Sequence, residues 1–579
     1  MELDDAFRYI GKFGRYQMFV YALMSFYCCW LSGFQLTGMI FVGYAPKTYY
    51  CTPPSGFLSN ETTPVTETND GTKEIDKCHM YDVTDDGNVT NNLTDCVYGW
   101  DYVSQSGEAS LVTDFDLYCD KDIYAKAAQS VLMAGVLVGS VLSGHLSDYF
   151  GRKIVLHAAL VLEALSGMAM ALSWNYYLVV FFWFMVGIFN QGLLNSSYVL
   201  LSEIFPPEVR TMSTPIVGII WGVAVTTFTP VAYLLPNWRH YELFVSLLCL
   251  IAIPMWWITP ESPRWLISQG RIEEAEEILQ KMAKVNKVKA PKSFLLENEG
   301  VPLTKTDCVT MVTDTSPTNH GYKPINKQYG GKMDKSINAS IVGDLRHCTL
   351  LDVIKAPLLF RNLLVMGFNW FSTSIVYYGL SLNSATLSGN MYLNVFLSCM
   401  VELPASLMIL LQKWVGRRPT LGVAFLMSGL CCVVTACLPK TNGKSISTAI
   451  IVVSTLGKFW ISFAFNVIYF YTPEIMPTPV RTLCFGVCSM FARIGGIVAP
   501  FVIYLNNVTE YLPLNFLGVC AIFAAFVSQM LPETRNIPLP ETFKDGIELA
   551  QDSLYNRCSR SADGYKEAED DQKEQRNDV

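Results

Sequence analysis

The chain has 579 residues, of which 51% are hydrophobic and only 16% are charged, and its formal net charge is −8. A chain of this length with so many apolar residues is far too hydrophobic for a soluble protein. The composition therefore excludes a soluble globular protein and indicates a protein that lies in a membrane.

Apolar segments long enough to cross a bilayer recur along the chain. A helix needs about 20 apolar residues to span the hydrocarbon core, and a window of about 19 residues detects such segments. The sequence predicts six spans, a polar interruption and six more spans, near 16–43, 126–147, 153–174, 176–202, 211–236, 241–259, 361–382, 391–412, 419–438, 447–472, 482–505 and 513–531. We therefore expect an all-α membrane protein with twelve transmembrane helices.

The flanks of these spans predict the orientation of the chain. The first span follows charged residues and is too long for the apolar core of a cleavable signal peptide. Basic residues lie before span 1 and after spans 2, 4, 8 and 10, at Arg8, Lys12, Arg15, Arg152, Lys153, Arg210, Lys413, Arg417, Arg418 and Arg481. Because cytoplasmic loops carry the excess of Lys and Arg, both termini are predicted to be cytoplasmic.

This orientation assigns each segment to one side of the membrane. In the cytoplasmic loop, apolar residues from Ile272 to Met282 recur at helical spacing and predict an amphipathic helix. From about 287 to 338 the loop turns Lys-, Thr- and Pro-rich, which is typical of a flexible linker. The segments are 1–15 (cytoplasmic), 16–43 (first span), 44–125 (extracellular), 126–259 (spans 2–6), 260–360 (cytoplasmic), 361–531 (spans 7–12) and 532–579 (cytoplasmic tail, with a charged and disordered end).

The extracellular loop carries the marks of the secretory pathway. Its glycosylation sequons begin at Asn60, Asn88 and Asn92. Four cysteines, Cys51, Cys78, Cys96 and Cys119, predict two disulfides whose pairing the sequence leaves open. The loop is also acidic, with roughly four acids per base, which would enrich cations near it or simply keep it soluble.

Short sequences near the predicted cytoplasmic helix ends occur twice. The run from Glu203 to Arg210 (EIFPPEVR) returns from Glu474 to Arg481 (EIMPTPVR) with the acid, Ile, Pro and Val-Arg at identical spacing. Gly151-Arg152-Lys153 and Pro260-Glu261-Ser262 likewise return as Gly416-Arg417-Arg418 and Pro532-Glu533-Thr534. Two six-helix halves related by an axis along the membrane normal are the layout of major facilitator transporters, whose substrates bind between the halves near the midplane.

The motifs resemble those of one branch of these transporters. Residues 144–153 (GHLSDYFGRK) resemble the major facilitator loop motif G-x-L-x-D-x-x-G-R-K. The runs at 99–102 (GWDY), 115–119 (FDLYC), 256–277, 377–383 (YYGLSLN), 400–405 (MVELPA), 456–459 (LGKF) and 531–542 (LPETRNIPLPET) resemble the organic cation/carnitine transporter family. The resemblance covers nearly the whole chain except 287–340 and the tail, and it implies a plasma-membrane carrier for organic cations or zwitterions such as carnitine.

Acids and bases at the predicted cytoplasmic helix ends suggest a gate. Networks of such charges can lock one side of a transporter and part when the halves rock, although isolated surface pairs contribute only about 0–1 kcal/mol each. The alternative is that the basic residues only hold these loops inside. The candidate gating residues are Asp148, Arg152, Glu203, Arg210, Glu261 and Arg264 in the first half and Arg417, Glu474, Arg481 and Glu533 in the second.

Polar and aromatic residues inside the spans predict the substrate cavity. Aromatic faces attract quaternary ammonium groups, by about 2 kcal/mol when desolvated. By position, Trp221, Trp370 and Tyr377 resemble the aromatic cage of the family, although any one of them could instead pack in the core or face lipid. Asn195, Asn466 and Tyr469 are further candidates.

Full charges inside the spans are the strongest candidates, because a charge in the bilayer costs at least about 2.5 kcal/mol and marks function by default. We expect Glu402 to take an ammonium group and Arg493 a carboxylate, with Gly495 and Gly496 leaving room for close approach; a permanent Glu402–Arg493 pair is the alternative. The combination resembles the carnitine branch of the family. Lys458, in the LGKF element, is assigned to helix packing, and Glu163 has no assigned role.

Other classes fit the sequence less well. No HExxH motif, Cys/His ligand cluster, P-loop or GxSxG motif is present, so we expect neither an enzyme nor a metal site. An organic anion transporter of the same family and a non-transporting receptor with this fold remain alternatives. The expected partners are a small organic solute and the lipid bilayer, with no nucleic acid and a monomeric transport unit; no cofactor is expected, and coupling to Na⁺ or to the membrane potential is left open.

Overall fold

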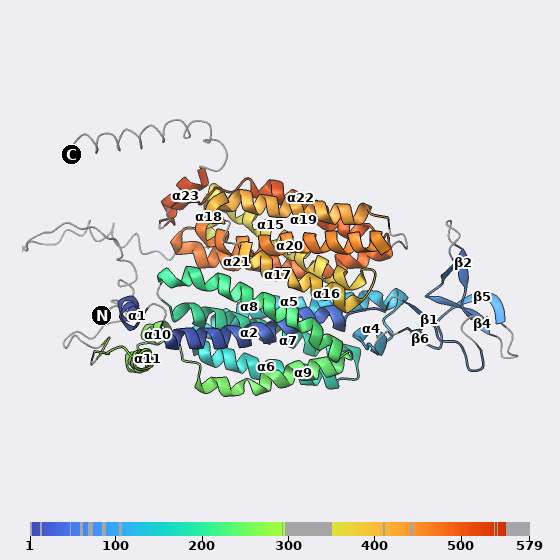
Figure 1. Cartoon of the computed structure of the whole chain (residues 1–579), viewed down its shortest axis with the longest axis horizontal. Helices are drawn as coiled ribbons and strands as arrows, with labels where there is room; N and C mark the ends of the chain where they lie inside the picture. The colour runs from blue at the N-terminus through green and yellow to red at the C-terminus, as the bar shows by residue number, and fades with distance from the viewer. Residues whose placement is uncertain are drawn as a thin grey trace, which may run out of the picture.

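The computed structural model describes residues 3–551 apart from 296–349 and shorter gaps at 12–13, 47, 58–61, 68–72, 84–88, 104–106, 206, 292, 409–411, 440–443, 536, 538 and 541. Its helices form two bundles that lie side by side (Figure 1). The first half contains α2 (Arg15–Val42), α5 (Asp122–Phe150), α6 (Arg152–Leu172), α7 (Tyr176–Glu203), α8 (Pro207–Leu234) and α9 (Trp238–Ile251), which η2 (Ile253–Trp257) follows.

The second half repeats this arrangement. It contains α15 (Pro357–Thr386), α16 (Met391–Met400), α17 (Glu402–Leu407), α18 (Gln412–Val415), α19 (Arg417–Cys437), α20 (Lys444–Ile475), η4 (Thr478–Val480), α21 (Arg481–Tyr504), η5 (Leu505–Asn507) and α22 (Leu512–Ser528). Ten helical segments in the described residues are long and apolar enough to cross a membrane. Two shorter apolar segments, Met391–Leu407 and Leu512–Ser528, stand where the eighth and twelfth spans are predicted.

Local signals place the helix ends. Asn175, Asn237 and Asn390 precede α7, α9 and α16, and each side chain accepts a backbone N–H of the first turn, which satisfies a donor that the helix leaves free. Gly151 before α6 and Gly416 before α19 have φ angles of 103° and 97°, which side chains with a Cβ rarely adopt. The same tight turn therefore stands at the same place in both halves.

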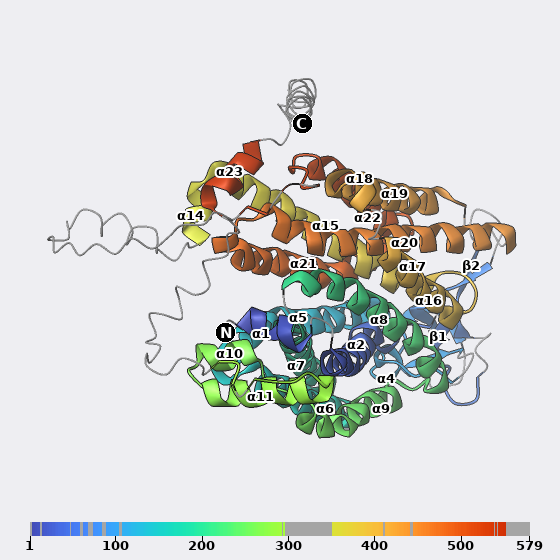
Figure 2. The ribbon, with the colours of Figure 1, turned by 60° about the vertical axis from the view of Figure 1, so that its left-hand side comes forward.

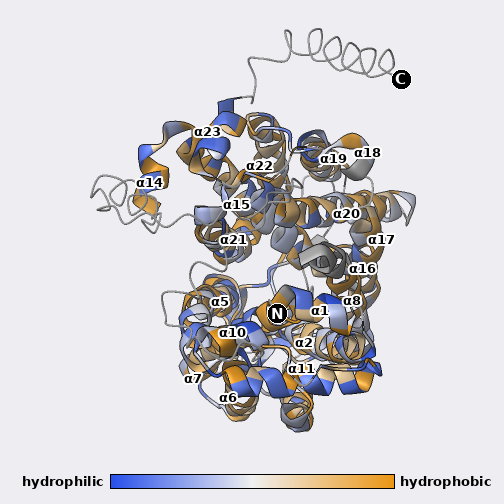
Figure 3. Cartoon of the chain, turned by 90° about the vertical axis from the view of Figure 1, so that its left-hand side faces the viewer, coloured by the Kyte–Doolittle hydropathy of each residue, from blue (hydrophilic) through white to orange (hydrophobic). Residues whose placement is uncertain are grey.

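We call the end of the bundle that carries Gly151 and Gly416 the repeat end. Figure 3 views the molecule from this end, with the second half above the first. The short helices here are α1 (Leu3–Ile10), α10 (Pro263–Ser268), α11 (Ile272–Asn286), α14 (Leu350–Lys355) and α23 (Phe543–Gln551). The predicted amphipathic helix is α11, which buries Leu279 and Met282 against Phe7 and Ile10 of α1. Most of the predicted linker and the end of the tail lie outside the described residues.

The opposite end, which we call the disulfide end, carries short strands that the sequence analysis did not predict. They form three antiparallel pairs, β1 (Tyr49–Cys51) with β6 (Trp100–Tyr102), β2 (Val65–Glu67) with β3 (Lys73–Ile75), and β4 (His79–Val83) with β5 (Val89–Asp95). Disulfides join Cys51 to Cys96 and Cys78 to Cys119. Asn92 is exposed on β5, whereas Asn60 and Asn88 lie outside the described residues.

The two halves contact each other along α5 and α21 and along α8 and α16–α17, as the turned view in Figure 2 also shows. Toward the disulfide end, the Ser130 hydroxyl donates to the Ile497 carbonyl at 2.8 Å, and the Asn507 amide donates to Asp122 at 3.0 Å. The Phe41 and Tyr392 rings stack across the same interface with centroids 5.2 Å apart. These contacts hold the halves together at the disulfide end.

Candidate substrate site

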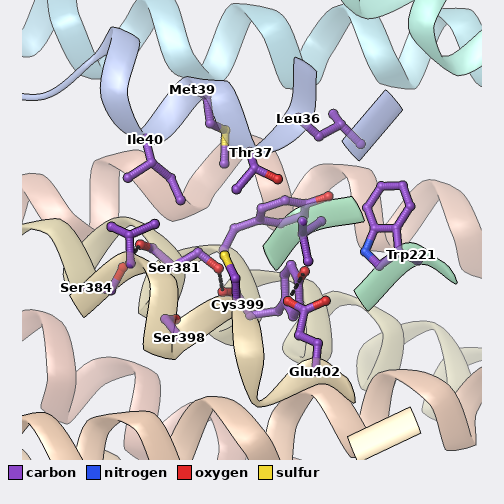
Figure 4. Close-up of a pocket in the computed structure, with 14 residues that line it drawn as sticks. Leu36, Thr37, Met39, Ile40, Trp221, Ser381, Ser384, Ser398, Cys399 and Glu402 are labelled. Carbon is purple, nitrogen blue, oxygen red and sulfur yellow. Dashed lines mark hydrogen bonds between the residues drawn. The ribbon is translucent and has the colours of Figure 1, made fainter. Parts of the chain in front are cut away.

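A pocket lies between the two halves, in the interior of the bundle. It holds about 420 Å³ of space, part of it open to solvent, and draws on α2 and α8 from the first half and on α15, α16 and α17 from the second. Figure 4 shows the α2 residues on one side and Ser381, Ser398 and Glu402 on the other. The lining residues are Leu36, Thr37, Met39, Ile40, Trp221, Val225, Tyr377, Tyr378, Ser381, Ser384, Val395, Ser398, Cys399 and Glu402.

The pocket has an apolar wall and a polar wall. The first half supplies mainly aliphatic side chains and the Trp221 indole, whereas the second half supplies hydroxyl groups and the carboxylate of Glu402. A ligand that fits both walls carries an apolar body and a polar or charged group. Pockets of this composition, with few convergent polar groups, are typical of small-molecule sites.

Glu402 stands at the start of α17, where the helix that begins as α16 is interrupted. Pro404 has no N–H to donate to the Met400 carbonyl one turn earlier, so the helical ladder breaks at this junction. Glu402 is 6% exposed. Its Oε1 atom accepts the Tyr377 hydroxyl at 2.6 Å, a short bond of the kind that a charged acceptor makes.

Lys458 of α20 is the salt-bridge partner of Glu402, with Nζ 3.4 Å from Oε1. Its ammonium also donates to the Ser381 hydroxyl at 2.6 Å and lies 3.0 Å from the centroid of the Tyr377 ring. The sequence favours helix packing for Lys458, and the structure adds that its ammonium contacts residues that line the pocket. The signal was present, because a lysine inside an apolar span is expensive and points to a partner.

Arg493 lies one side chain behind the pocket. It is 9% exposed on α21 and does not line the pocket, but its charge acts on Tyr378, which does. The expected space beside Arg493 is absent at Gly495, where a Cβ would come 2.5 Å from the Phe371 carbonyl oxygen, so this glycine serves the close packing of α21 on α15. In the structure Glu402 forms its salt bridge with Lys458. It does not form the permanent pair with Arg493 that was the alternative.

The aromatic candidates occupy two different places. Trp221 and Tyr377 line the pocket. Trp370 is 1% exposed, donates its indole N–H to Thr472 at 2.8 Å and packs 4.6 Å from the Tyr469 ring. Phe465 touches both Trp370 and Tyr377, so these two rings do share one helix face, but Trp370 and Tyr469 form the packed layer behind the pocket rather than its lining.

The two candidate amides also lie away from the pocket lining. Asn195 donates to the Ser143 hydroxyl at 3.0 Å and accepts from Gln191 at 2.6 Å, which ties α7 to α5 inside the first half. Asn466 donates to the Ser462 carbonyl at 3.0 Å and lies 3.5 Å from the Ser406 hydroxyl. Its position near Gly218 places it where α20 meets α8 of the other half.

The first half buries two carboxylates of its own. Glu163, fully buried on α6, accepts the Asn190 amide at 2.9 Å, and Glu242, on α9, accepts the Gln35 amide at 2.8 Å. Neither lines the pocket between the halves. Glu242 was missed because it stands at the edge of its predicted span, where an acid looks like a solvated helix end.

The candidate gating residues form two matching networks at the repeat end. In the first half the Arg152 guanidinium meets Glu203 through two bonds of 3.1 and 3.2 Å and Asp148 at 3.0 Å. Glu261 accepts the backbone N–H groups of Arg152 and Lys153. Burial raises the pKa of the Glu261 carboxyl, and these N–H groups oppose the shift only in part.

The second half repeats the network with the equivalent residues. Arg417 lies 3.0 Å from Glu474, and Glu533 accepts the backbone N–H groups of Arg417 and Arg418. Each of these pairs joins residues of one half, so the networks brace the helix ends within a half. That they part during transport stays a prediction.

The remaining gating candidates have other neighbours. The Arg481 guanidinium donates to the carbonyls of Met476 and Pro540, which ties α21 to the segment after α22. The Arg264 guanidinium lies 5.8 Å from the centroid of the Phe7 ring. The side chain of Arg210 lies outside the described residues. Across the described part of the chain, no group of three or more His, Cys, Asp or Glu residues could hold a metal ion.

Comparison with solved structures defines the fold. The proton:xylose symporter XylE bound to 6-bromo-6-deoxy-D-glucose aligns with a TM-score of 0.54 over 93% of this chain and 99% of that one, at 15% identity. The inward open conformation of the xylose transporter XylE from E. coli gives the same TM-score over 90% of this chain and 98% of that one, also at 15% identity. The sequence profile of the Major Facilitator Superfamily matches residues 123–500. The chain is therefore a membrane transporter of the major facilitator superfamily, which confirms the predicted fold.

Its relatives define the branch. Solute carrier family 22 member 16 of Xenopus laevis is 30% identical over 95% of each chain. The organic cation transporter-like protein of Drosophila melanogaster is 32% identical, covering 94% of this chain and 92% of the relative. Organic cation/carnitine transporter 2 of Mus musculus is 29% identical, covering 95% of this chain and 94% of the relative. The chain belongs to this organic cation/carnitine family of solute carriers, as its motifs predict.

Proposed function

We propose that this protein carries small organic cations or zwitterions such as carnitine across the plasma membrane by alternating access. The observation that supports this most is the pocket between the halves, in which the Glu402 carboxylate accepts the Tyr377 hydroxyl and Trp221 is a further lining residue (Figure 4). A carboxylate with aromatic faces is the chemistry that holds an ammonium group in a desolvated site.

In this proposal the two ends of a zwitterion meet different residues. The ammonium group binds toward Glu402 and Tyr377 on the polar wall. The carboxylate of the substrate reaches Arg493, which does not line the pocket in this structure, once the lining residue Tyr378 turns aside. A planar guanidinium then offers two parallel hydrogen bonds to the carboxylate.

The contacts between the halves fit alternating access. If the basic loops are cytoplasmic, the disulfide end is extracellular, and the bonds of Ser130 and Asn507 across the interface close the pocket on that side. Opening to the outside must break these bonds while each half keeps its own network at the repeat end.

Uptake of labelled tetraethylammonium and labelled carnitine into cells that express the chain tests the proposal. The expected result is saturable uptake of at least one of them above that of cells without the protein. A protein that reaches the surface and binds these compounds without moving them would be a receptor, and one that does neither would overturn the proposal.

One observation favours a second candidate, an organic anion carrier. Lys458 and Arg493 together outnumber Glu402 among the charges at and behind the pocket, so this part of the molecule carries one excess positive charge. Labelled benzoate in the same uptake assay distinguishes the two. Saturable benzoate uptake without cation uptake would favour the anion carrier.

A further inference from the structure

The ammonium of Lys458 is surrounded by the groups that bind an ammonium substrate. Its Nζ atom lies 3.4 Å from the Glu402 carboxylate, 2.6 Å from the Ser381 hydroxyl and 3.3 Å from the Tyr377 carbonyl, and it lies over the Tyr377 ring. Lys458 as a whole is 2% exposed. A carboxylate, two neutral acceptors and an aromatic face together satisfy a primary ammonium without water.

The same groups also face the pocket. Glu402, Tyr377 and Ser381 all line it, whereas Lys458 does not and approaches them from α20. One carboxylate is therefore shared between an internal cation and whatever enters the pocket. Two ammonium groups on one buried carboxylate would repel each other at short range and leave one positive charge uncompensated.

We propose that Lys458 is a built-in competitor for the ammonium subsite and thereby determines which substrates bind. This inference rests on the proposed function. A substrate ammonium takes Glu402 only when Lys458 gives up this partner. The apparent affinity for a simple cation is then the intrinsic affinity multiplied by the fraction of molecules in which Lys458 is not paired with Glu402.

A zwitterion escapes this penalty, because its own carboxylate can pair with the displaced Lys458 ammonium. The exchange then replaces one salt bridge with two and leaves no charge without a partner. Lys458 thus favours substrates that carry both charges over simple cations. This selectivity is separate from any contribution of Arg493, which does not line the pocket.

The test compares Lys458→Met, which removes the charge, with Lys458→Arg, which keeps it. KM and maximal rate are measured for tetraethylammonium and for carnitine and corrected for protein at the surface. In Lys458→Met we expect the KM for tetraethylammonium to fall about tenfold and that for carnitine to rise about tenfold. Lys458→Arg should keep the preference of the wild type. A purely structural role would move both KM values together or lower only the amount at the surface, and either result overturns the proposal.

Two further comparisons keep the test decisive. In a Glu402→Gln background, Lys458→Met should no longer lower the KM for tetraethylammonium, since the competition acts through Glu402. If Lys458→Met does not reach the surface, Ser381→Ala removes its 2.6 Å hydrogen bond without removing a charge and should lower the KM for tetraethylammonium about threefold. Ser372→Ala is the matched control, because Ser372 is a buried serine of the same helix that does not line the pocket and bonds Cys520. Equal KM values in these two serine variants would contradict the proposal.

Uptake by the wild type distinguishes a failure of the proposed function from a failure of the role inferred for Lys458. If the wild type neither binds nor carries tetraethylammonium or carnitine, the proposed function fails, and this inference fails with it. If the wild type carries either compound and Lys458→Met leaves the preference unchanged, only the role of Lys458 is wrong.

Discussion

The two halves are nearly alike at the repeat end and unlike in the interior. Arg152 with Glu203 and Arg417 with Glu474 make the same ion pair on equivalent helices. Inside the bundle, the second half directs Glu402 into the pocket and holds Lys458 against it, whereas the first half lines the pocket mainly with apolar side chains. The buried carboxylates of the first half, Glu163 and Glu242, bond amides elsewhere.

This difference suggests a division of roles, in which the matched networks at the repeat end serve the movement of the halves and the unmatched interior serves the binding of substrate. Both halves need the same bracing at their helix ends, because the rocking of one half against the other requires two rigid bodies. In the proposed function, one polar wall is enough to recognise an asymmetric substrate, and the second half supplies the polar wall of this pocket. Variants that act on one property without the other therefore test the division.

The largest effect is expected from Glu402→Gln. It keeps the shape of the side chain and removes the charge that an ammonium group would meet; a charged hydrogen bond contributes about 1.5–3 kcal/mol. We expect kcat/KM for cation and zwitterion uptake to fall about 10- to 100-fold. The fall is measured as uptake corrected for the amount of protein at the surface. Unchanged uptake of tetraethylammonium would make Glu402 a structural residue.

The next largest effect is expected from charge reversal at the repeat end. Arg152→Glu places a carboxylate beside Glu203, and Arg417→Glu does the same beside Glu474. Both should lower the maximal rate about tenfold and leave KM within about twofold, because the change disturbs bracing rather than the pocket.

The reciprocal exchange is the control for this prediction. Arg152→Glu combined with Glu203→Arg restores the pair in reverse and should recover part of the rate. If charge reversal slows transport when it is made in one half but not when it is made in the other, the two networks are not equivalent. The comparison of the halves is then wrong at the repeat end.

A smaller and more selective effect is expected from Arg493→Lys. Lysine keeps the positive charge but cannot make two parallel bonds to a carboxylate. The KM for carnitine should rise about fivefold, while that for tetraethylammonium stays the same, since one hydrogen bond to a charged group is lost. Tyr378→Phe is the companion variant, because it removes the lining hydroxyl on which the Arg493 charge acts. If Arg493→Lys leaves carnitine affinity undiminished, Arg493 is not the carboxylate partner.

The sequence predicts this fold well because hydropathy and repeats are local signals. The spans, the duplicated loops and the choice of Glu402 as a candidate all follow from residue types and spacing. The sequence does not predict which residue pairs with Glu402. Lys458 and Arg493 are both cations inside spans, and the rotation of their helices decides which of them reaches the carboxylate. Helix rotation also decides the place of Trp370. Its i,i+7 spacing from Tyr377 predicts a shared helix face but does not predict that Trp370 lies outside the pocket lining.

The loop at the disulfide end shows a different limit. Four cysteines allow three pairings, and the choice of Cys51–Cys96 with Cys78–Cys119 depends on contacts between distant segments. The β4–β5 pair is carried by short polar strands with little hydrophobic alternation, so pattern alone did not reveal it.

The smallest effect is expected from Glu163→Gln, which tests whether the first half stays out of recognition. Glu163 is as deeply buried as any acid in the described part of the chain, yet it bonds Asn190 inside the first half and does not line the pocket. Glutamine keeps its volume and an oxygen that can accept the Asn190 amide. The KM for tetraethylammonium and for carnitine should therefore stay within about twofold of the wild type, because changes at sites without shared partners act independently. Glu402→Gln, measured in parallel, is the matched variant from the other half. If Glu163→Gln raises KM as far as Glu402→Gln does, a buried carboxylate of the first half also acts on the substrate, and recognition is not confined to one wall.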